Sequence, residues 1–292
     1  MAYAQHQSFY LRDKWTSKGL KFLKENPKFF HEKFAFEQIG LGKNMVQSLK
    51  FWLLAMNLIE EDKKEKIHNL TKLGELVLKH DRLLLVQDTA SILHYQLVKN
   101  KEDRATIFDW FFNIYNETIV KRDDLEIAFE EYVQAVEQKE ISVKSLKKDI
   151  DCLIQLYTKD MNEFDPEDVI YSPFKKLNLL SEHKKVVRKS SPEIKNIGFT
   201  ALYYVLLNYV HSHEINTLSI DEIISKKFLW GRVFNLSRGE IIEALNHLTV
   251  HKKYPIQFVR TNNLDSIKLP VISPIEFLKE EYEEMELAVN EF

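Results

Sequence analysis

Apolar residues recur at helical spacing along most of the chain, and one helix-length segment changes character partway along. Between about Lys43 and Leu58, at about 100° per residue, one face is apolar throughout and carries Met45, Val46, Leu49, Trp52, Leu53 and Met56. The other face starts polar and turns apolar from Phe51 onward; its polar positions are Lys43, Asn44, Gln47 and Lys50. A recognition helix has this form, because its N-terminal residues meet base edges while the rest packs within the domain. An amphipathic core helix with a solvated face gives the same pattern, so the helix alone leaves both interpretations open.

The segments on either side of this helix predict a winged-helix module. Gly40 and Gly42 allow a tight turn after a shorter helical pattern at residues 31–39. A charged run at residues 60–66 separates two short extended pieces, as in a β-hairpin, and Thr71 is a good N-cap for the next helix. Helix, turn, helix, hairpin and helix is the winged-helix order. Unrelated helical packing is the alternative.

A second winged-helix module is predicted toward the C-terminal end. Its signals are two capped helices followed by a hairpin with an Asn-rich turn. Ser219 is the expected cap of a helix at 220–225, and Ser237, with Glu240, that of a helix at 238–249. The hairpin is expected at 256–269. An acidic helix at 275–289 follows. The residues between the two modules predict acidic helices around an aromatic core segment at 106–116.

Composition supports a mainly α fold. Of 292 residues 45% are hydrophobic and only seven are glycine, while Lys, Glu and Leu are abundant. We therefore expect an N-terminal winged-helix module at 1–80, an acidic helical middle at 81–170 and a C-terminal winged-helix-like module at 171–292. No apolar run approaches the about 20 residues that span a membrane, and no signal peptide is recognisable. A single cysteine, Cys152, excludes internal disulfides, and a cytoplasmic location is expected.

The net charge of −3 hides a strong segregation of charge along the chain. Residues 1–79 carry 14 Lys and Arg against 9 Asp and Glu, and residues 171–272 carry 15 against 8. Residues 80–170 carry 11 against 20, and residues 273–292 carry 1 against 7. Two basic regions suit a protein that meets nucleic acid. The alternative is that the acidic middle pairs with the basic flanks inside the fold.

Catalytic motifs are scarce. Neither a phosphate-cradling glycine loop nor a Gly-x-Ser-x-Gly elbow is present, and the histidines are scattered. Asp149 and Asp151 are weak candidates for a catalytic magnesium site, since nucleases hold magnesium with carboxylates. On a helix, however, residues two apart point about 200° away from each other. Asp149 lies at the edge of an apolar stripe, which favours a structural hydrogen-bonding role.

Taken together, these residues resemble the SspB family, a family of bacterial DNA phosphorothioation gene clusters long described only as a domain of unknown function. The motifs that carry the resemblance are His6-x-x-Phe9-Tyr10-x-Arg12-x-x-Trp15-x-x-Lys18-Gly19, Gly40-x-Gly42-Lys43-Asn44-Met45-Val46-x-Ser48-x-x-x-Trp52, Leu70-Thr71-x-x-Gly74, Leu146-x-x-Asp149-x-Asp151-Cys152 and Gly231-Arg232-Val233-Phe234-x-Leu236. The chain departs from the pattern at Gln7 and Ser8, where an acidic residue and threonine are expected, and at Trp230, where proline is expected.

The resemblance implies a DNA-binding subunit, with a candidate strand-nicking activity, of a phosphorothioate modification and phage-defence system. Its implied partners are double-stranded DNA, a cysteine desulfurase, an ATP-pyrophosphatase-like sulfur-transfer protein and an ATPase; no membrane partner is expected. No cofactor is evident, and Mg²⁺ or Mn²⁺ is expected only with nicking. The alternatives are a non-catalytic transcriptional regulator and a scaffold that binds proteins.

The residues point to two kinds of DNA contact. On the predicted recognition helix, the residues expected to face the groove are Lys43, Asn44, Gln47 and Lys50. Basic residues elsewhere are expected to contact phosphate, and these are Arg12, Lys63, Lys64, Arg232, Lys252 and Lys253. The resemblance carries over no catalytic or metal-binding residue.

Overall fold

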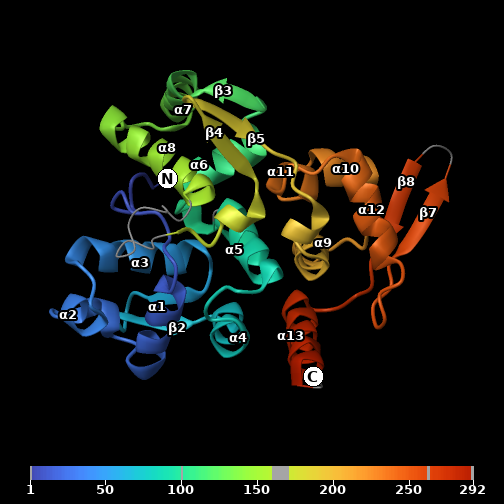
Figure 1. The fold of residues 1–292 in the computed structure, drawn as a ribbon, viewed down its shortest axis with the longest axis horizontal. Coiled ribbons are helices and arrows are strands. Elements are labelled where there is room, and N and C mark those ends of the chain that lie inside the picture. Colours follow the sequence, from blue (N-terminus) through green and yellow to red (C-terminus); the bar gives the residue numbers. More distant parts are fainter. Residues whose placement is uncertain (1, 100, 160–170, 262–263, 291–292) are drawn as a thin grey trace.

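A computed structural model describes residues 2–99, 101–159, 171–261 and 264–290. The fold is mainly α, as expected, with three small antiparallel sheets (Figure 1). In the described residues, no helix combines the length and apolar character needed to cross a bilayer. The Asn-rich turn predicted in the second hairpin falls at Asn262 and Asn263, outside the described residues.

The N-terminal unit has the predicted order of helices and hairpin. Its elements are α1 (Trp15–Glu25), η1 (Phe29–His31), α2 (Ala35–Ile39), α3 (Lys43–Ala55), β1 (Ile59–Asp62), β2 (Ile67–Leu70) and α4 (Lys72–His80). Gly40 ends α2 with a φ of 68°, a left-handed conformation that favours glycine. Gly42 is extended, so only Gly40 uses this freedom. Thr71 caps α4 as predicted, its side chain accepting a hydrogen bond from the Gly74 N–H.

The middle of the chain contains a sheet as well as the expected helices. Its elements are α5 (Gln87–Lys99), η2 (Lys101–Asp103), α6 (Thr106–Asp109), the π-helix η3 (Trp110–Ile114), β3 (Ile119–Lys121), α7 (Arg122–Val136), α8 (Val143–Thr158), η4 (Lys175–Leu177), β4 (Leu180–His183) and β5 (Val186–Lys189). Strand β5 lies between β3 and β4. This sheet therefore joins residues on both sides of the expected boundary at residue 170.

The C-terminal part repeats the connectivity of the middle sheet. Its elements are η5 (Ile194–Asn196), α9 (Phe199–His213), β6 (Thr217–Ser219), α10 (Ile220–Ser225), α11 (Trp230–Val233), α12 (Arg238–Leu248), β7 (Gln257–Thr261), β8 (Leu264–Lys268) and α13 (Pro274–Asn290). In both sheets the first strand is followed by helices and then by a hairpin whose second strand pairs with the first. Ser219 and Ser237 both cap their helices as predicted, and both form complete capping boxes, of which only the one at Ser237 was expected.

Helix α13 connects the two ends of the molecule. It lies between α4 of the N-terminal unit and α9 of the C-terminal unit (Figure 1). The Tyr282 hydroxyl is 2.8 Å from the Thr89 hydroxyl, and the Tyr282 ring stacks on His80 with centroids 5.4 Å apart. His80 Nδ1 is also 2.7 Å from a Glu286 oxygen. The acidic helix is thus a packing helix at least as far as Glu286.

The centre of the molecule holds a fully buried histidine that joins three segments. His94 of α5 donates a hydrogen bond from Nε2 to the Val233 carbonyl of α11, at 2.7 Å. Because Nε2 carries the proton, Nδ1 accepts from the Tyr157 hydroxyl of α8, at 2.6 Å. Burial lowers the pKa of His94 to about 3. The neutral imidazole is therefore the form that this packing requires.

Acid is expected to destabilise the protein through His94. The unfolded chain protonates this histidine below about pH 6.5, whereas burial holds its folded pKa at about 3. The free energy of unfolding should therefore fall by up to about 1.4 kcal/mol per pH unit as the pH drops between those two values. Urea unfolding measured across this range tests the expectation. His94→Gln should remove this part of the slope, and an equal slope in both proteins would contradict it.

Candidate nucleic-acid interface

Helix α3 has the two-part character that its sequence predicts. Lys43, Asn44 and Gln47 are exposed in its first two turns. From Phe51 onward every residue of the helix is buried. This holds for the apolar face and also for the face that is polar in the first two turns. The exposed polar surface of α3 is therefore confined to its N-terminal half, as the residues predict.

The N-terminal end of α3 is open to an anion. Gly42 is the N-cap and supplies no side-chain hydrogen bond to the first turn. The uncapped N–H groups and the helix dipole give this end a partial positive charge, which binds phosphate groups in many proteins. Lys43 adds a full positive charge there, and its ammonium lies 5.0 Å from the centroid of the Phe36 ring. Both features suit a DNA phosphate at this end of α3.

The β1–β2 hairpin carries two exposed lysines at its tip. Asp62 closes the turn, since its Oδ1 accepts hydrogen bonds from the backbone N–H groups of Lys64 and Glu65. The side chains of Lys63 and Lys64 are exposed. Lys50, by contrast, is half-buried and donates a hydrogen bond to Glu61 Oε1 on β1, at 3.3 Å. Lys50 therefore ties α3 to the hairpin, while the two tip lysines are available to a ligand.

Arg12 lies in an aromatic surround on the N-terminal segment. Its guanidinium carbon is 5.3, 6.0 and 5.5 Å from the ring centroids of Phe9, Tyr10 and Trp15. The segment packs on α3, because the Phe9 carbonyl accepts hydrogen bonds from Ser48 and Trp52. Arg12 is half-buried. It is thus held in place by stacking beside the helix expected to read DNA.

The basic residues predicted in the C-terminal unit belong to α11 and to the segment after α12, elements that lie apart from α3 (Figure 1). Most of these residues are engaged with other side chains. Arg232 donates hydrogen bonds to the Ser225 carbonyl, at 3.2 Å, and to Asn116 Oδ1, at 2.7 Å. Lys253 contacts Glu280 and Glu284 of α13, at 3.2 and 2.6 Å. Lys252 is exposed. The predicted DNA contacts therefore fall into two groups, one on α3, the hairpin and the N-terminal segment, and the other on α11 and the segment after α12.

Asp149 and Asp151 point to different surroundings, as their spacing on α8 predicts. Asp149 is buried and accepts hydrogen bonds from the Ala4 N–H, at 2.9 Å, and from His6 Nε2, at 2.8 Å. The opposite ring nitrogen of His6 accepts from the Ser8 N–H, which leaves the proton on Nε2. Burial is the largest influence on Asp149 and raises its pKa. This geometry favours the structural interpretation of Asp149.

Asp151 is half-exposed and pairs with the guanidinium of Arg122. Arg122 also contacts Glu182 Oε1, at 3.0 Å. The two aspartates thus lie on opposite sides of α8 and share no ligand position. A magnesium site built on both of them is not supported by this arrangement.

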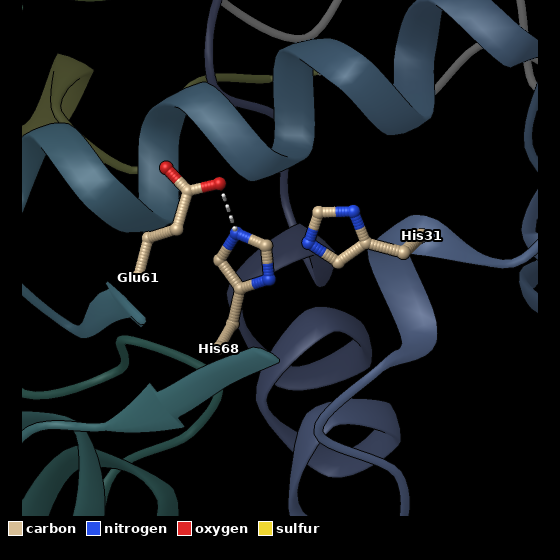
Figure 2. A group of neighbouring side chains, drawn as sticks. All are labelled: His31, Glu61 and His68. Carbon is tan, nitrogen blue, oxygen red and sulfur yellow. Dashed lines mark ion pairs between the residues drawn. The ribbon is translucent and has the colours of Figure 1, made fainter. Parts of the chain in front are cut away.

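His31, Glu61 and His68 form a cluster in the N-terminal unit that the sequence did not predict (Figure 2). Glu61 and His68 stand opposite each other in the β1–β2 register. The predicted hairpin, with its tip at residues 63–66, was the one sequence signal that could have placed Glu61 opposite His68. His31 comes from η1, and its position depends on how that turn packs against the hairpin. Sequence spacing therefore could not bring all three together.

Comparison with known proteins gives one family and one fold. A family model described as "Protein of unknown function (DUF4007)" matches residues 3–282. The solved structure titled "Magnesium ion-bound SspB crystal structure" has a TM-score of 0.86 at 21% identity, covering 97% of this chain and 88% of that one. The structure titled "SspB crystal structure" gives a TM-score of 0.85 at the same identity and coverage. No curated protein matches. The resemblance to SspB is confirmed, and at this identity it establishes the fold.

Proposed function

Because the chain belongs to the family of unknown function DUF4007 and has the fold of SspB, we propose that it is a DNA-binding subunit of a bacterial DNA phosphorothioate modification and phage-defence system. One observation carries the proposal beyond resemblance. Helix α3 exposes Lys43, Asn44 and Gln47 at an uncapped N-terminus and buries its second half. A helix held in this way can enter a major groove with its N-terminal turns.

The modules that present DNA contacts are proposed to be winged helices. In the N-terminal unit, support comes from the order α1, α2, α3, hairpin and α4, with Lys63 and Lys64 at the hairpin tip. In the C-terminal unit, support comes from the strand order β6-β8-β7 around α10 and α12. In this proposal the two modules are separate DNA contacts, and α3 with its hairpin is the principal one.

Nicking and the partner proteins rest on the resemblance alone. SspB is regarded as a strand-nicking subunit that works with a cysteine desulfurase, a sulfur-transfer protein and an ATPase. For this chain, Asp149 is engaged with His6 and Asp151 with Arg122, so the two carboxylates do not meet at one metal position. We propose DNA binding as the activity of the chain itself and a cytoplasmic location for the system.

Salt-dependent binding to duplex DNA tests the proposal. Fluorescence anisotropy with a labelled duplex at several salt concentrations should give a linear fall of log K with log salt, because cations on the protein release counterions from phosphate. Lys43→Ala and Lys63→Ala should each make the slope shallower by about 0.9. Lys139→Ala removes the same charge from an exposed site between α7 and α8 in the acidic middle, and should leave the slope unchanged.

Four results would contradict the proposal. Absence of a salt slope would exclude phosphate contact, and equal effects of Lys43→Ala and Lys139→Ala would exclude α3 as the contact. Co-purification with partner proteins and no mobility shift of DNA would favour the scaffold alternative. Strong preference for one operator sequence would favour a transcriptional regulator that uses the same surface.

A further inference from the structure

Three side chains that can ligate a metal converge beside the β1–β2 hairpin. His31, Glu61 and His68 each offer one ligand atom, and these atoms all lie within 4.8 Å of one another. The hairpin register places Glu61 opposite His68. The rings of His31 and His68 stack with centroids 5.0 Å apart, and the Glu61 carboxylate lies on the other side of His68 (Figure 2). The cluster therefore combines two imidazoles and one carboxylate from three separate elements.

His68 is the unusual member, because it is fully buried and neither ring nitrogen has a hydrogen-bond partner. Its Nε2 lies 3.6 Å from Glu61 Oε1, which is too far for a hydrogen bond. Buried polar side chains almost always have a hydrogen-bonding or ligand partner, so the unpaired imidazole of His68 indicates a partner that the protein side chains do not supply. Because neither ring nitrogen is engaged, the lone pair of the imidazole is free to bind a cation.

The local fold holds the ligands without help from a metal. The backbone N–H of His68 donates to the Pro27 carbonyl, at 2.8 Å, which fixes β2 against the turn that leads into η1. Phe30 packs edge-on against His68, with centroids 5.5 Å apart, and forms an apolar wall. His31 is exposed and leaves a route from solvent. The backbone is therefore fixed around His68, and small rotations of the His31 and Glu61 side chains would bring the three ligand atoms, now within 4.8 Å of one another, onto one ion.

We propose that His31, Glu61 and His68 bind one Zn²⁺ ion, or a transition-metal cation of similar preference. Two histidines and a glutamate with one open position are a ligand set that zinc takes in proteins. Magnesium prefers oxygen ligands and is disfavoured by two imidazoles. The site is separate from Asp149 and Asp151 on α8. It lies within the unit that carries α3 and the hairpin.

Lys50 is the cation that now faces the carboxylate of this site. Its ammonium contacts the same Glu61 oxygen that faces His68. An incoming metal takes this oxygen, and the side chain of Lys50, which is 29% exposed, turns toward solvent. Metal and Lys50 therefore compete. Replacing Lys50 with glutamine should raise zinc affinity by about fivefold or more, since it removes the positive charge that lies 3.3 Å from the ligating Glu61 oxygen.

Zinc titration of the full chain tests the proposal directly. After treatment with a chelator and dialysis, calorimetry with ZnCl₂ should show one equivalent bound, and bound zinc should raise the melting temperature. His31→Ala changes an exposed residue and should preserve the fold, yet lower zinc affinity by at least about 100-fold, more than loss of an outer-shell partner does. Glu61→Gln should act in the same direction. Co²⁺ in place of Zn²⁺ should give the strong visible absorption of a tetrahedral site in the wild-type protein and not in His31→Ala.

The control is His183→Ala, which removes an exposed histidine from β4 and should leave zinc binding unchanged. The proposal is overturned if the wild-type chain binds no zinc, or if His31→Ala and Glu61→Gln bind it as the wild type does. Equal weakening by His183→Ala would show surface binding only. Displacement of zinc by millimolar Mg²⁺ would contradict the assigned ligands, and weaker zinc binding by Lys50→Gln would contradict the position of the ion beside Glu61.

Discussion

Replacing Asp149 with alanine is expected to lower the free energy of unfolding by about 3–5 kcal/mol. The change removes the acceptor of both the His6 Nε2–H and the Ala4 N–H, and leaves the fully buried His6 donor and the half-buried Ala4 donor without this partner. It also weakens the attachment of the N-terminal segment, whose Phe9 carbonyl accepts hydrogen bonds from Ser48 and Trp52 of α3. Urea unfolding followed by circular dichroism measures the effect.

Asp151→Ala is the matched control two residues further along α8. Asp151 is half-exposed, and Arg122 keeps its contact with Glu182 when Asp151 is removed, so the expected loss is below about 1 kcal/mol. A plasmid-nicking assay with Mg²⁺ or Mn²⁺ on both variants adds a second readout. An Asp149→Ala protein that unfolds like the wild type but fails to nick plasmid would make Asp149 catalytic and refute its structural role.

Gly74→Ala is expected to destabilise the N-terminal unit by about 3 kcal/mol or more. A Cβ on Gly74 would lie 2.0 Å from the Leu58 carbonyl oxygen, which is backbone and cannot move like the end of a side chain. That oxygen is fixed by a 3.0 Å hydrogen bond from the Thr71 N–H. Either α4 or the start of the hairpin must shift, so the urea midpoint should fall and DNA affinity should fall with it.

The same chemical change at Gly239 should have the opposite sign. Gly239 is exposed in α12, and a Cβ there comes no closer than 3.9 Å to the Ser237 hydroxyl. Alanine also favours helix over glycine, so Gly239→Ala should be neutral or stabilising by up to about 1 kcal/mol. Equal destabilisation by both variants would mean that the contact with Leu58 is not the cause.

The parts of the fold that follow from nearby residues were predictable. The N-caps at Thr71, Ser219 and Ser237 depend on residues within four positions and formed as expected. The partition of α3 into an exposed N-terminal half and a buried C-terminal half followed from side-chain periodicity. The mainly α class and the resemblance to SspB rested on patterns of this local kind and were confirmed, whereas the winged-helix modules stay a prediction.

Features that join distant segments were not readable from the sequence. His6 and Asp149 are 143 positions apart, and nothing in their local patterns pairs them. Strand β3 was missed because three residues give a weak signal, and its partner β5 comes after α7 and α8. His31, Glu61 and His68 come together only because η1 packs on the β1–β2 hairpin, which sequence spacing does not predict. The predicted DNA contacts on α3 and in the C-terminal unit remain predictions.

The docking of α13 on α4 and on Thr89 of α5 can be completed only late in synthesis. Thr89 and Tyr282, which hydrogen-bond, are 193 positions apart, and His80 stacks on the same tyrosine. A ribosome adds about 5–20 residues per second, so about 10–40 seconds separate the synthesis of these partners. For that interval the side of α4 that will receive α13 is uncovered. A newly made N-terminal unit therefore offers a surface to chaperones that the finished protein has closed.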